Sequence, residues 1–195
     1  MLTEIGGLML AEAFPSEHRA AALLAGEAVA RVLAARQWTE RFAVQVEGQG
    51  VLIPARLHFA SDRLGLTESD EAWRFACALQ TRSNNGFERQ RAVRNLLADL
   101  QPWAAPFIVA LIGEYIIEIL DDIAASLTPE NTRTLGAFVI QNEAYWNTTK
   151  RRVISYWDVY YRSVRRSETR RLYRRDDYIG FKLIDLLEMA AFGSA

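Results

Sequence analysis

Apolar residues first recur with a helical spacing, and the spacing then changes to that of a strand. Pro15-Ser16-Glu17 predicts a helix start with Ser16 as N-cap, because a serine hydroxyl accepts a free backbone N–H and an acid favours the first turn. From Ala20 to Arg36 the apolar residues form a narrow stripe padded with alanine, as one packed helix face requires. Apolar positions then alternate on both sides of Gly48-Gln49-Gly50, which predicts a β-hairpin with one apolar face. The alternating positions are Phe42, Val44 and Val46 before the turn and Val51, Ile53, Ala55, Leu57 and Phe59 after it.

From Thr67 onward the apolar residues recur every three and four positions, which predicts a series of helices. Asn84-Asn85-Gly86 and Gln101-Pro102-Trp103 interrupt the pattern, because Asn, Gly and Pro favour turns. The segment from about Ala104 to Leu127 is the most apolar and predicts one long buried helix. An aromatic helix and a C-terminal helix follow. The C-terminal helix should bury a stripe formed by Phe181, Ile184, Leu187 and Ala191, with Leu183 and Met189 flanking it.

These patterns together predict a mostly α protein in which antiparallel helix pairs stack, with a small N-terminal β-hairpin against one side. An isolated hairpin is marginal in water, so its apolar face should lie on the helices. No linker rich in Gly, Ser or Pro divides the 195 residues, which predicts a single domain. Within it, residues 1–66 would form the first helix and the hairpin, and residues 67–195 the helical array.

The stretch "GFERQRAVRNLLADLQPWAAPFIVALIGEYIIEILDDIAASL", Gly86 to Leu127, resembles a HEAT-like helical repeat. Such repeats place an arginine-bearing helix before a proline-marked turn and an apolar second helix, and neighbouring pairs stack into an α-solenoid. The resemblance therefore implies an extended array with a surface for protein partners. Outside this stretch the chain resembles uncharacterised bacterial proteins. The matching residues are Arg91, Ala92, Val93, Arg94, Leu96 and Leu97 in the first helix, and Pro102, Ala105, Pro106, Phe107 and Leu111 in the second.

Composition narrows the class of protein. Half of the residues are hydrophobic, about a quarter are charged and the net charge is -1, which fits a globular protein without a global field for nucleic acid. Cys77 is the single cysteine, so an intrachain disulfide is excluded, and its apolar neighbours predict a buried structural thiol. The first residues lack a basic region and carry acids at Glu4 and Glu12, which argues against a signal peptide. We expect a cytoplasmic protein that does not span a membrane.

One segment departs from this charge balance. Residues 150–175 hold ten basic residues against Asp158 and Glu168, a charge of +8, so the remainder of the chain carries -1 minus 8, or -9. Tyrosines lie between the basic residues, a combination typical of single-stranded nucleic-acid binding. The alternative, which we favour, is that the aromatic residues form a core face and the arginines pair with acids of this chain or of a partner. The candidate contacts with nucleic acid or a partner are Lys150, Arg151, Arg162, Arg165, Arg166, Arg170, Arg171, Arg174 and Arg175.

A second charged group lies along the apolar segment. Its carboxylates recur at helical spacing, so they would share one helix face and could form a divalent-metal site or an acid/base pair. The interpretation that we favour is structural ion pairing with arginines of the preceding helix, since such pairs readily imitate functional sites. The acids are Glu114, Glu118, Asp121 and Asp122, and the arginines are Arg89, Arg91 and Arg94.

The chain carries no glycine-rich phosphate loop, no zinc spacing and no hydrolase nucleophile motif. His18 and His58 lie on different predicted elements, so we expect no metal, no cofactor and no catalytic residues. The leading hypothesis is a non-catalytic helical-repeat scaffold that mediates protein–protein interaction. The alternative is a nucleic-acid-binding protein that uses residues 150–175, and a third hypothesis is a metal-dependent enzyme at the Glu114, Glu118 and Asp122 face. The sequence does not define the partner or the oligomeric state.

Overall fold

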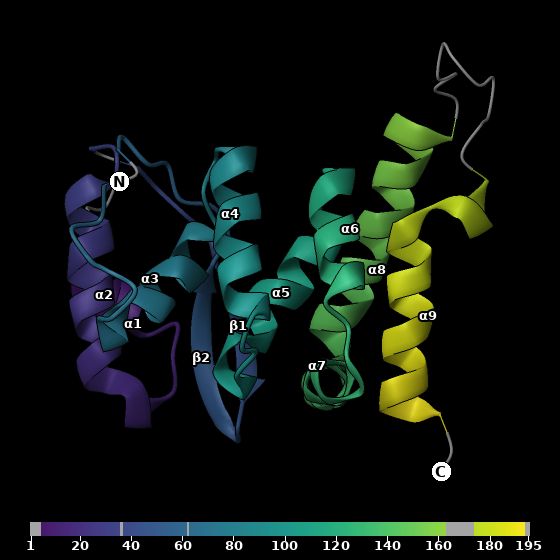
Figure 1. The fold of residues 1–195 in the computed structure, drawn as a ribbon, viewed down its shortest axis with the longest axis horizontal. Coiled ribbons are helices and arrows are strands. Elements are labelled where there is room, and N and C mark those ends of the chain that lie inside the picture. Colours follow the sequence, from purple (N-terminus) through teal and green to yellow (C-terminus); the bar gives the residue numbers. More distant parts are fainter. Residues whose placement is uncertain (1–4, 36, 62, 163–173, 194–195) are drawn as a thin grey trace. The chain divides into compact units, whose positions relative to one another are not determined.

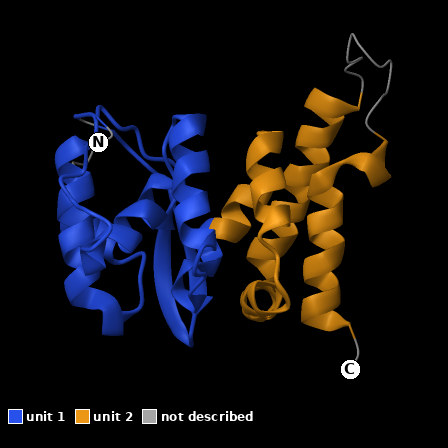
Figure 2. Cartoon of the chain, viewed as in Figure 1, with its two compact units in different colours: residues 1–107 blue, residues 108–195 orange. Residues whose placement is uncertain are grey.

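The computed structural model describes residues 5–35, 37–61, 63–162 and 174–193 (Figure 1). The chain separates into two compact units, residues 1–107 and 108–195 (Figure 2). The described residues are mostly helical and include one small antiparallel sheet, which confirms the predicted fold class at this level. The predicted single domain stays a prediction. Within the described residues, no helix combines the length and the apolar character needed to cross a bilayer.

Unit 1 begins with a closely packed helix pair, α1 (Gly7–Ala11) and α2 (Arg19–Val32). Gly26 of α2 lies against the backbone of Gly7, where an added Cβ would overlap the Gly7 carbonyl oxygen. The buried face of α2 is mostly alanine, and the predicted stripe is largely wrong, because its Leu23 is half-buried and its Leu24 is exposed. The predicted cap is wrong, because residues Ser16–His18 form a short 3-10 helix, η1, without a side-chain cap. The Ser16 hydroxyl instead donates to Oε1 of Gln49 at 2.8 Å.

The hairpin consists of β1 (Arg41–Val46) and β2 (Gln49–Pro54). Its turn lies at Glu47-Gly48, whose φ angles are 50° and 79°, so the predicted turn at residues 48–50 is displaced. A tight two-residue hairpin turn with positive φ at both central residues fits Glu47-Gly48. Gln49 and Gly50, which were predicted to lie in the turn, pair with Val46 and Gln45 in the ladder. The predicted second strand is also too long. It ends at Pro54, which has no N–H to donate to the ladder, and only isolated bridges follow at Leu57 and Phe59. The side chains buried by the hairpin are Val44, Val46, Val51 and Ile53.

The remainder of unit 1 holds α3 (Glu71–Gln80), α4 (Gly86–Leu97) and the 3-10 helix η2 (Pro102–Ala104). Asn85 caps α4, since its Oδ1 accepts the N–H of Phe87 at 3.0 Å. The buried Arg82 joins the turn after α3 to the hairpin. Its Nε donates to the carbonyl of Pro54 at 3.1 Å and its Nη2 to that of Ala55 at 2.7 Å. The backbone carbonyls at the end of β2 therefore accept hydrogen bonds from a charged donor.

The most apolar segment is not one helix. It forms α5 (Ala105–Ile112) and α6 (Ile117–Ala125), so the predicted continuous helix from Ala104 to Leu127 is wrong. The break contains Gly113, which disfavours a helix interior, and an exposed Tyr115. The residues of α5 are all buried, which fits the predicted burial of this segment.

Unit 2 continues with α7 (Pro129–Gln141), α8 (Glu143–Tyr156) and α9 (Ile179–Phe192). Thr128 caps α7 by accepting the N–H of Asn131 at 3.1 Å. A π-helical turn, η3 (Trp157–Tyr161), extends α8, and the short 3-10 helix η4 (Arg175–Asp177) precedes α9. Helices α8 and α9 lie side by side (Figure 1), and α7 packs on α9 where Gly136 meets Ala190. The buried side chains of these helices include Leu135, Val139, Trp146, Val153, Leu183 and Leu187.

Candidate functional site

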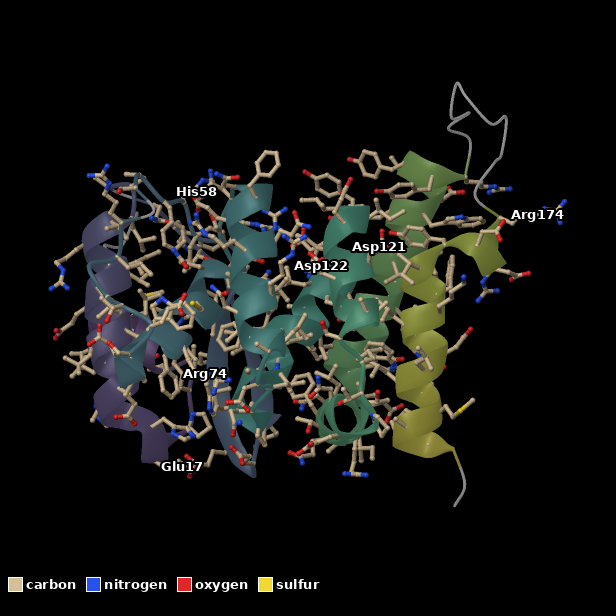
Figure 3. All side chains as sticks on the ribbon, in the orientation of Figure 1. Glu17, His58, Arg74, Asp121, Asp122 and Arg174 are labelled. Atoms are coloured by element: carbon tan, nitrogen blue, oxygen red, sulfur yellow. The ribbon has the colours of Figure 1, made fainter. Side chains whose placement is uncertain are left out.

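The described basic residues of the segment 150–175 contact other groups of unit 2. Nζ of Lys150 on α8 lies 2.6 Å from Oε1 of Glu188 on α9. Nη1 of Arg162 lies 2.7 Å from Oδ1 of Asp158. Arg175 lies over the ring of Phe181, 4.7 Å from its centroid. In addition, Arg151 donates to the hydroxyl of Thr148 at 3.0 Å, and Arg174 is exposed (Figure 3). Arg165, Arg166, Arg170 and Arg171 lie outside the described residues.

The tyrosines of this segment are only partly a core face. In the π-helical turn the N–H of Arg162 donates to the carbonyl of Trp157 at 2.8 Å, five residues back, so the side chains within this turn do not keep α-helical spacing. Tyr160 is exposed and stacks on Tyr115 with ring centroids 5.3 Å apart, while Tyr156 is half-buried. The prediction that Tyr160 belongs to a core face is therefore wrong, because it relied on a continuous α-helix.

The predicted ion-pairing residues belong to different units. Arg89 is buried in unit 1, where its Nη1 donates to the carbonyl of Ser83 at 2.7 Å, and Arg91 and Arg94 are exposed on α4. In unit 2, Glu114 is buried, Glu118 and Asp121 are exposed, and Asp122 is half-buried. The pairing between the arginines and the acids stays a prediction. Among the described residues, the three-ligand group that converges closely enough for a metal ion does not include Glu114, Glu118 or Asp122.

Cys77 is a buried thiol, as predicted. It is 1% exposed, and Nδ2 of Asn95 lies 3.8 Å from its sulfur. Burial raises the pKa of the Cys77 thiol to about 11, and the hydrogen bond from Asn95 opposes this rise. Burial thus holds the thiol in its protonated form, which is the less nucleophilic one.

Helix α9 exposes a second apolar face. Leu186, Met189 and Phe192 recur every three residues and are 45%, 71% and 55% exposed, respectively. We call these three side chains the α9 ridge. The other side of the helix carries most of the predicted buried stripe, since Phe181, Ile184 and Leu187 are buried. Ala191 of that stripe is half-buried, and Leu183, predicted to flank it, is fully buried. Helix α9 is thus apolar on two faces, and unit 2 covers one of them.

Unit 1 contains an open cleft of about 460 Å³ with an acidic rim. Phe75 and Trp103 form one wall as stacked rings with centroids 4.3 Å apart. Arg74 lies 5.9 Å from the Trp103 centroid, and its Nη1 is 2.5 Å from Oδ2 of Asp99. The rim carries more acids than bases, which favours a cationic occupant. Its charged residues are Glu68, Asp70, Glu71, Arg74 and Asp99.

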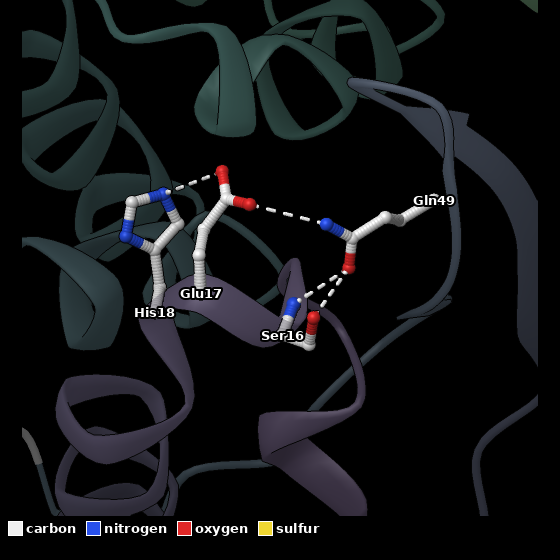
Figure 4. Close-up of polar contacts among 4 residues, drawn as sticks. All are labelled: Ser16, Glu17, His18 and Gln49. Atoms are coloured by element: carbon white, nitrogen blue, oxygen red, sulfur yellow. Dashed lines mark hydrogen bonds and ion pairs between the residues drawn. The ribbon is translucent and has the colours of Figure 1, made fainter.

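One histidine of this cleft belongs to a second group of polar side chains. Glu17, His18 and Glu47 each offer a ligand atom, and these three atoms all lie within 4.8 Å of one another. Nε2 of His18 lies 3.8 Å from Oε1 of Glu17, as Figure 4 shows. The His18 ring also packs 5.3 Å from the ring of Phe75 and 6.2 Å from that of Trp103. The hairpin turn thus brings Glu47 to His18, and the expectation of no metal ligand stays a prediction.

Sequence reasoning missed this group for a geometrical reason. Glu17 and His18 are adjacent, but Glu47 is almost thirty residues away at the tip of the hairpin. Only the pairing of η1 with a hairpin whose turn lies at Glu47-Gly48 brings the three side chains together. The one available signal was the adjacent Glu-His pair in a segment that precedes a helix.

In comparisons with known proteins, no protein-family model, no curated protein and no solved structure matches the chain.

Proposed function

We propose that this protein is a non-catalytic interaction module, and that the α9 ridge is its contact surface for a protein partner. The observation that carries the proposal is the exposed second apolar face of α9. A helix that is apolar on all sides is normally buried on all sides, and contiguous exposed apolar side chains mark interaction sites.

The spacing of the ridge defines the kind of partner. Leu186, Met189 and Phe192 follow one another at intervals of three residues, so their side chains form a row along the helix axis. Such a row fits a groove between two helices or strands of a partner, in the manner of helix-in-groove recognition. Met189 is the most exposed of the three and lies at the centre, and the flexible thioether adapts to irregular surfaces.

Burial of the ridge would supply part of the energy of a specific contact. Full burial of a Leu, Met or Phe side chain contributes about 1.5–3 kcal/mol, and the ridge leaves roughly half of each side chain still exposed. Covering the ridge would therefore contribute about 3–4 kcal/mol, with the polar rim of an interface supplying the remainder. Lys182 and Asp185 are exposed on the same helix and are suited to such a rim.

We extend the proposal to a HEAT-like stacking of helix pairs. Its support is α4, which buries Ala92, Val93, Leu96 and Leu97, exposes arginines on its other side and is followed by the Pro102 turn and the apolar α5. The proposal also assigns the protein to the cytoplasm, for which the lone reduced thiol of Cys77 is the support.

Nucleic-acid binding through residues 150–175 is the competing proposal. Exposed tyrosines near Arg162 support it, because bases stack on aromatic rings. The contacts of Lys150 with Glu188 and of Arg162 with Asp158 weigh against it, since phosphates would have to displace them. We therefore favour the protein partner.

Affinity capture from the native cell extract tests the proposal with three chains. The baits are the wild type, Met189→Arg and the control Ala137→Arg. The control places the same charge on an exposed position of α7. We expect a stoichiometric protein on the wild type and the control, and its recovery to fall about tenfold or more with Met189→Arg, since a buried unpaired charge is costly. Nucleic acid is assayed in the same eluates, with nuclease-treated extract in parallel.

Three results would contradict the proposal. The wild-type bait returns no stoichiometric protein, or Met189→Arg recovers the same protein as the wild type, or capture disappears with nuclease. The third result favours the nucleic-acid proposal.

A further inference from the structure

We infer that Glu17, His18 and Glu47 form a binding site for a divalent transition-metal ion of the Zn²⁺ type in unit 1. This site is separate from the α9 ridge, which belongs to unit 2, and does not depend on the proposed function.

The donor set suits this class of ion. An imidazole nitrogen with two carboxylate oxygens is a combination that Zn²⁺ accepts, whereas Mg²⁺ and Ca²⁺ prefer oxygen ligands throughout. Three protein ligands leave a fourth tetrahedral position for water or for a bound molecule. His18 also lines the acid-rimmed cleft.

The distances require only small side-chain adjustments. Bonds of about 2.0–2.2 Å place the ligand atoms of a tetrahedral site about 3.4 Å apart. The observed Glu17–His18 separation is 3.8 Å, and all three ligand atoms lie within 4.8 Å of one another. Glu17 and Glu47 are exposed, so rotation of their side chains can bring the carboxylates inward without moving the core.

The two parts of the site are fixed to each other by the fold. The carbonyl of Glu12, just before η1, accepts the N–H of Leu52 on β2 at 2.9 Å, and its carboxylate pairs with Arg41 on β1. These contacts hold the hairpin against the segment that carries Glu17 and His18. The ligands are therefore brought together by tertiary structure.

A chain of hydrogen bonds orients the Glu17 carboxylate. Oε1 of Gln49 accepts the backbone N–H and the hydroxyl of Ser16, at 2.9 and 2.8 Å. Nε2 of Gln49 then donates to Oε2 of Glu17 at 3.1 Å, while the other carboxylate oxygen faces His18 (Figure 4). Metal-binding carboxylates are commonly held by such outer hydrogen bonds, which keep one oxygen directed at the ion.

The electrostatics also favour a cation. Two carboxylates whose oxygens lie within 4.8 Å repel each other, and an ion between them would convert this repulsion into attraction. Glu47 itself has a φ of 50°, a conformation that Asn or Gly adopts with less strain at this turn position. Glutamate, unlike either of those residues, provides a carboxylate that reaches His18.

Isothermal titration of the metal-free full chain with Zn²⁺, and separately with Mg²⁺, tests the inference. We expect one Zn²⁺ per chain at micromolar concentration and no Mg²⁺ binding in the same range. His18→Gln and Glu47→Gln should each weaken Zn²⁺ binding by at least about tenfold, and Gln49→Ala by about tenfold through the orientation of Glu17. The matched controls are His58→Gln and Glu40→Gln, because Figure 3 places His58 at the other end of unit 1 from Glu17 and Glu40 lies outside the group.

Glu47→Asn separates a metal role from a turn role. Asparagine relieves the strain at a φ of 50° but removes the long carboxylate, so urea resistance of the metal-free chain should rise while Zn²⁺ affinity falls. Circular dichroism confirms that each variant is folded.

The inference is overturned if the wild type binds no Zn²⁺ up to millimolar concentration. It is equally overturned if His58→Gln weakens binding as much as His18→Gln, or if Glu47→Asn leaves the affinity unchanged.

Discussion

Ionisation of Cys77 gives a quantitative test of the core of unit 1. Burial raises the pKa of the thiol from its usual 9.0 to about 11 in the folded chain. In the unfolded chain the thiol loses its proton at the lower pH, so ionisation stabilises the unfolded state first. The contribution of Cys77 to stability is therefore intact below pH 9 and is lost as the pH rises from 9 to 11.

The size of the effect follows from the two pKa values. Each unit of difference corresponds to somewhat more than 1 kcal/mol, so the full loss above pH 11 is about 3 kcal/mol. Between pH 8 and pH 10 the expected loss is about 1 kcal/mol, a range in which most proteins can still be studied. Burial of Tyr178 raises the pKa of its phenol in the same direction, but that residue belongs to unit 2.

Urea denaturation at pH 8 and pH 10, followed by circular dichroism, measures this loss. The control is Cys77→Ala, which lacks the thiol but keeps Tyr178 and every other titrating group. The wild type should lose about 1 kcal/mol more than the control between the two pH values. Equal losses in the two chains, or reaction of the folded thiol with a disulfide reagent at the rate of a free cysteine, would refute the burial assigned to Cys77.

Two further substitutions test the helix contacts of each unit by urea denaturation. Gly26→Ala should lower the free energy of unfolding by about 2 kcal/mol, because the added Cβ overlaps the Gly7 carbonyl oxygen and the gain in helix propensity offsets only part of that strain. A stability equal to or above that of the wild type would contradict the close approach of α1 and α2. Thr128→Ala should lower the free energy of unfolding by about 1 kcal/mol through loss of the α7 cap, whereas Thr128→Ser, which keeps a hydroxyl, should leave it nearly unchanged. An equal effect of the two substitutions would exclude capping as the cause.

Much of the helical pattern was predictable because amphipathic spacing reports directly on which face is buried. The break between α3 and α4 at Asn84-Asn85-Gly86 and most of the buried stripe of α9 follow from local sequence. The break after Ile112 was not predictable, since a segment that is apolar on every side has no periodicity to interrupt. The π-helical turn at Trp157–Tyr161 was missed because a single five-residue step leaves no mark in a pattern of threes and fours.

The candidate sites likewise depend partly on local sequence and partly on tertiary structure. Exposure of Met189 was anticipated only in part, as a residue flanking the buried stripe of α9, because sequence alone does not tell which apolar faces find partners within the chain. The group of Glu17, His18 and Glu47 depended on a hairpin turn one residue away from the predicted place. The predicted side of each strand is correct, since Val44, Val46, Val51 and Ile53 are buried, but the position of the turn decides where Glu47 lies relative to η1, and local pattern does not define that contact.

Oxidation of methionine tests the central claim, that the α9 ridge is covered by a protein partner. Met189 is 71% exposed, and the half-buried Met9 in unit 1 provides an internal reference within the same chain. Dilute peroxide is applied to the purified protein and to the protein in its native extract, and sulfoxide at each methionine is measured by mass spectrometry. We expect oxidation of Met189, relative to Met9, to be several times slower in the extract. An unchanged ratio would contradict the claim, because a thioether at an occupied interface is shielded from the oxidant.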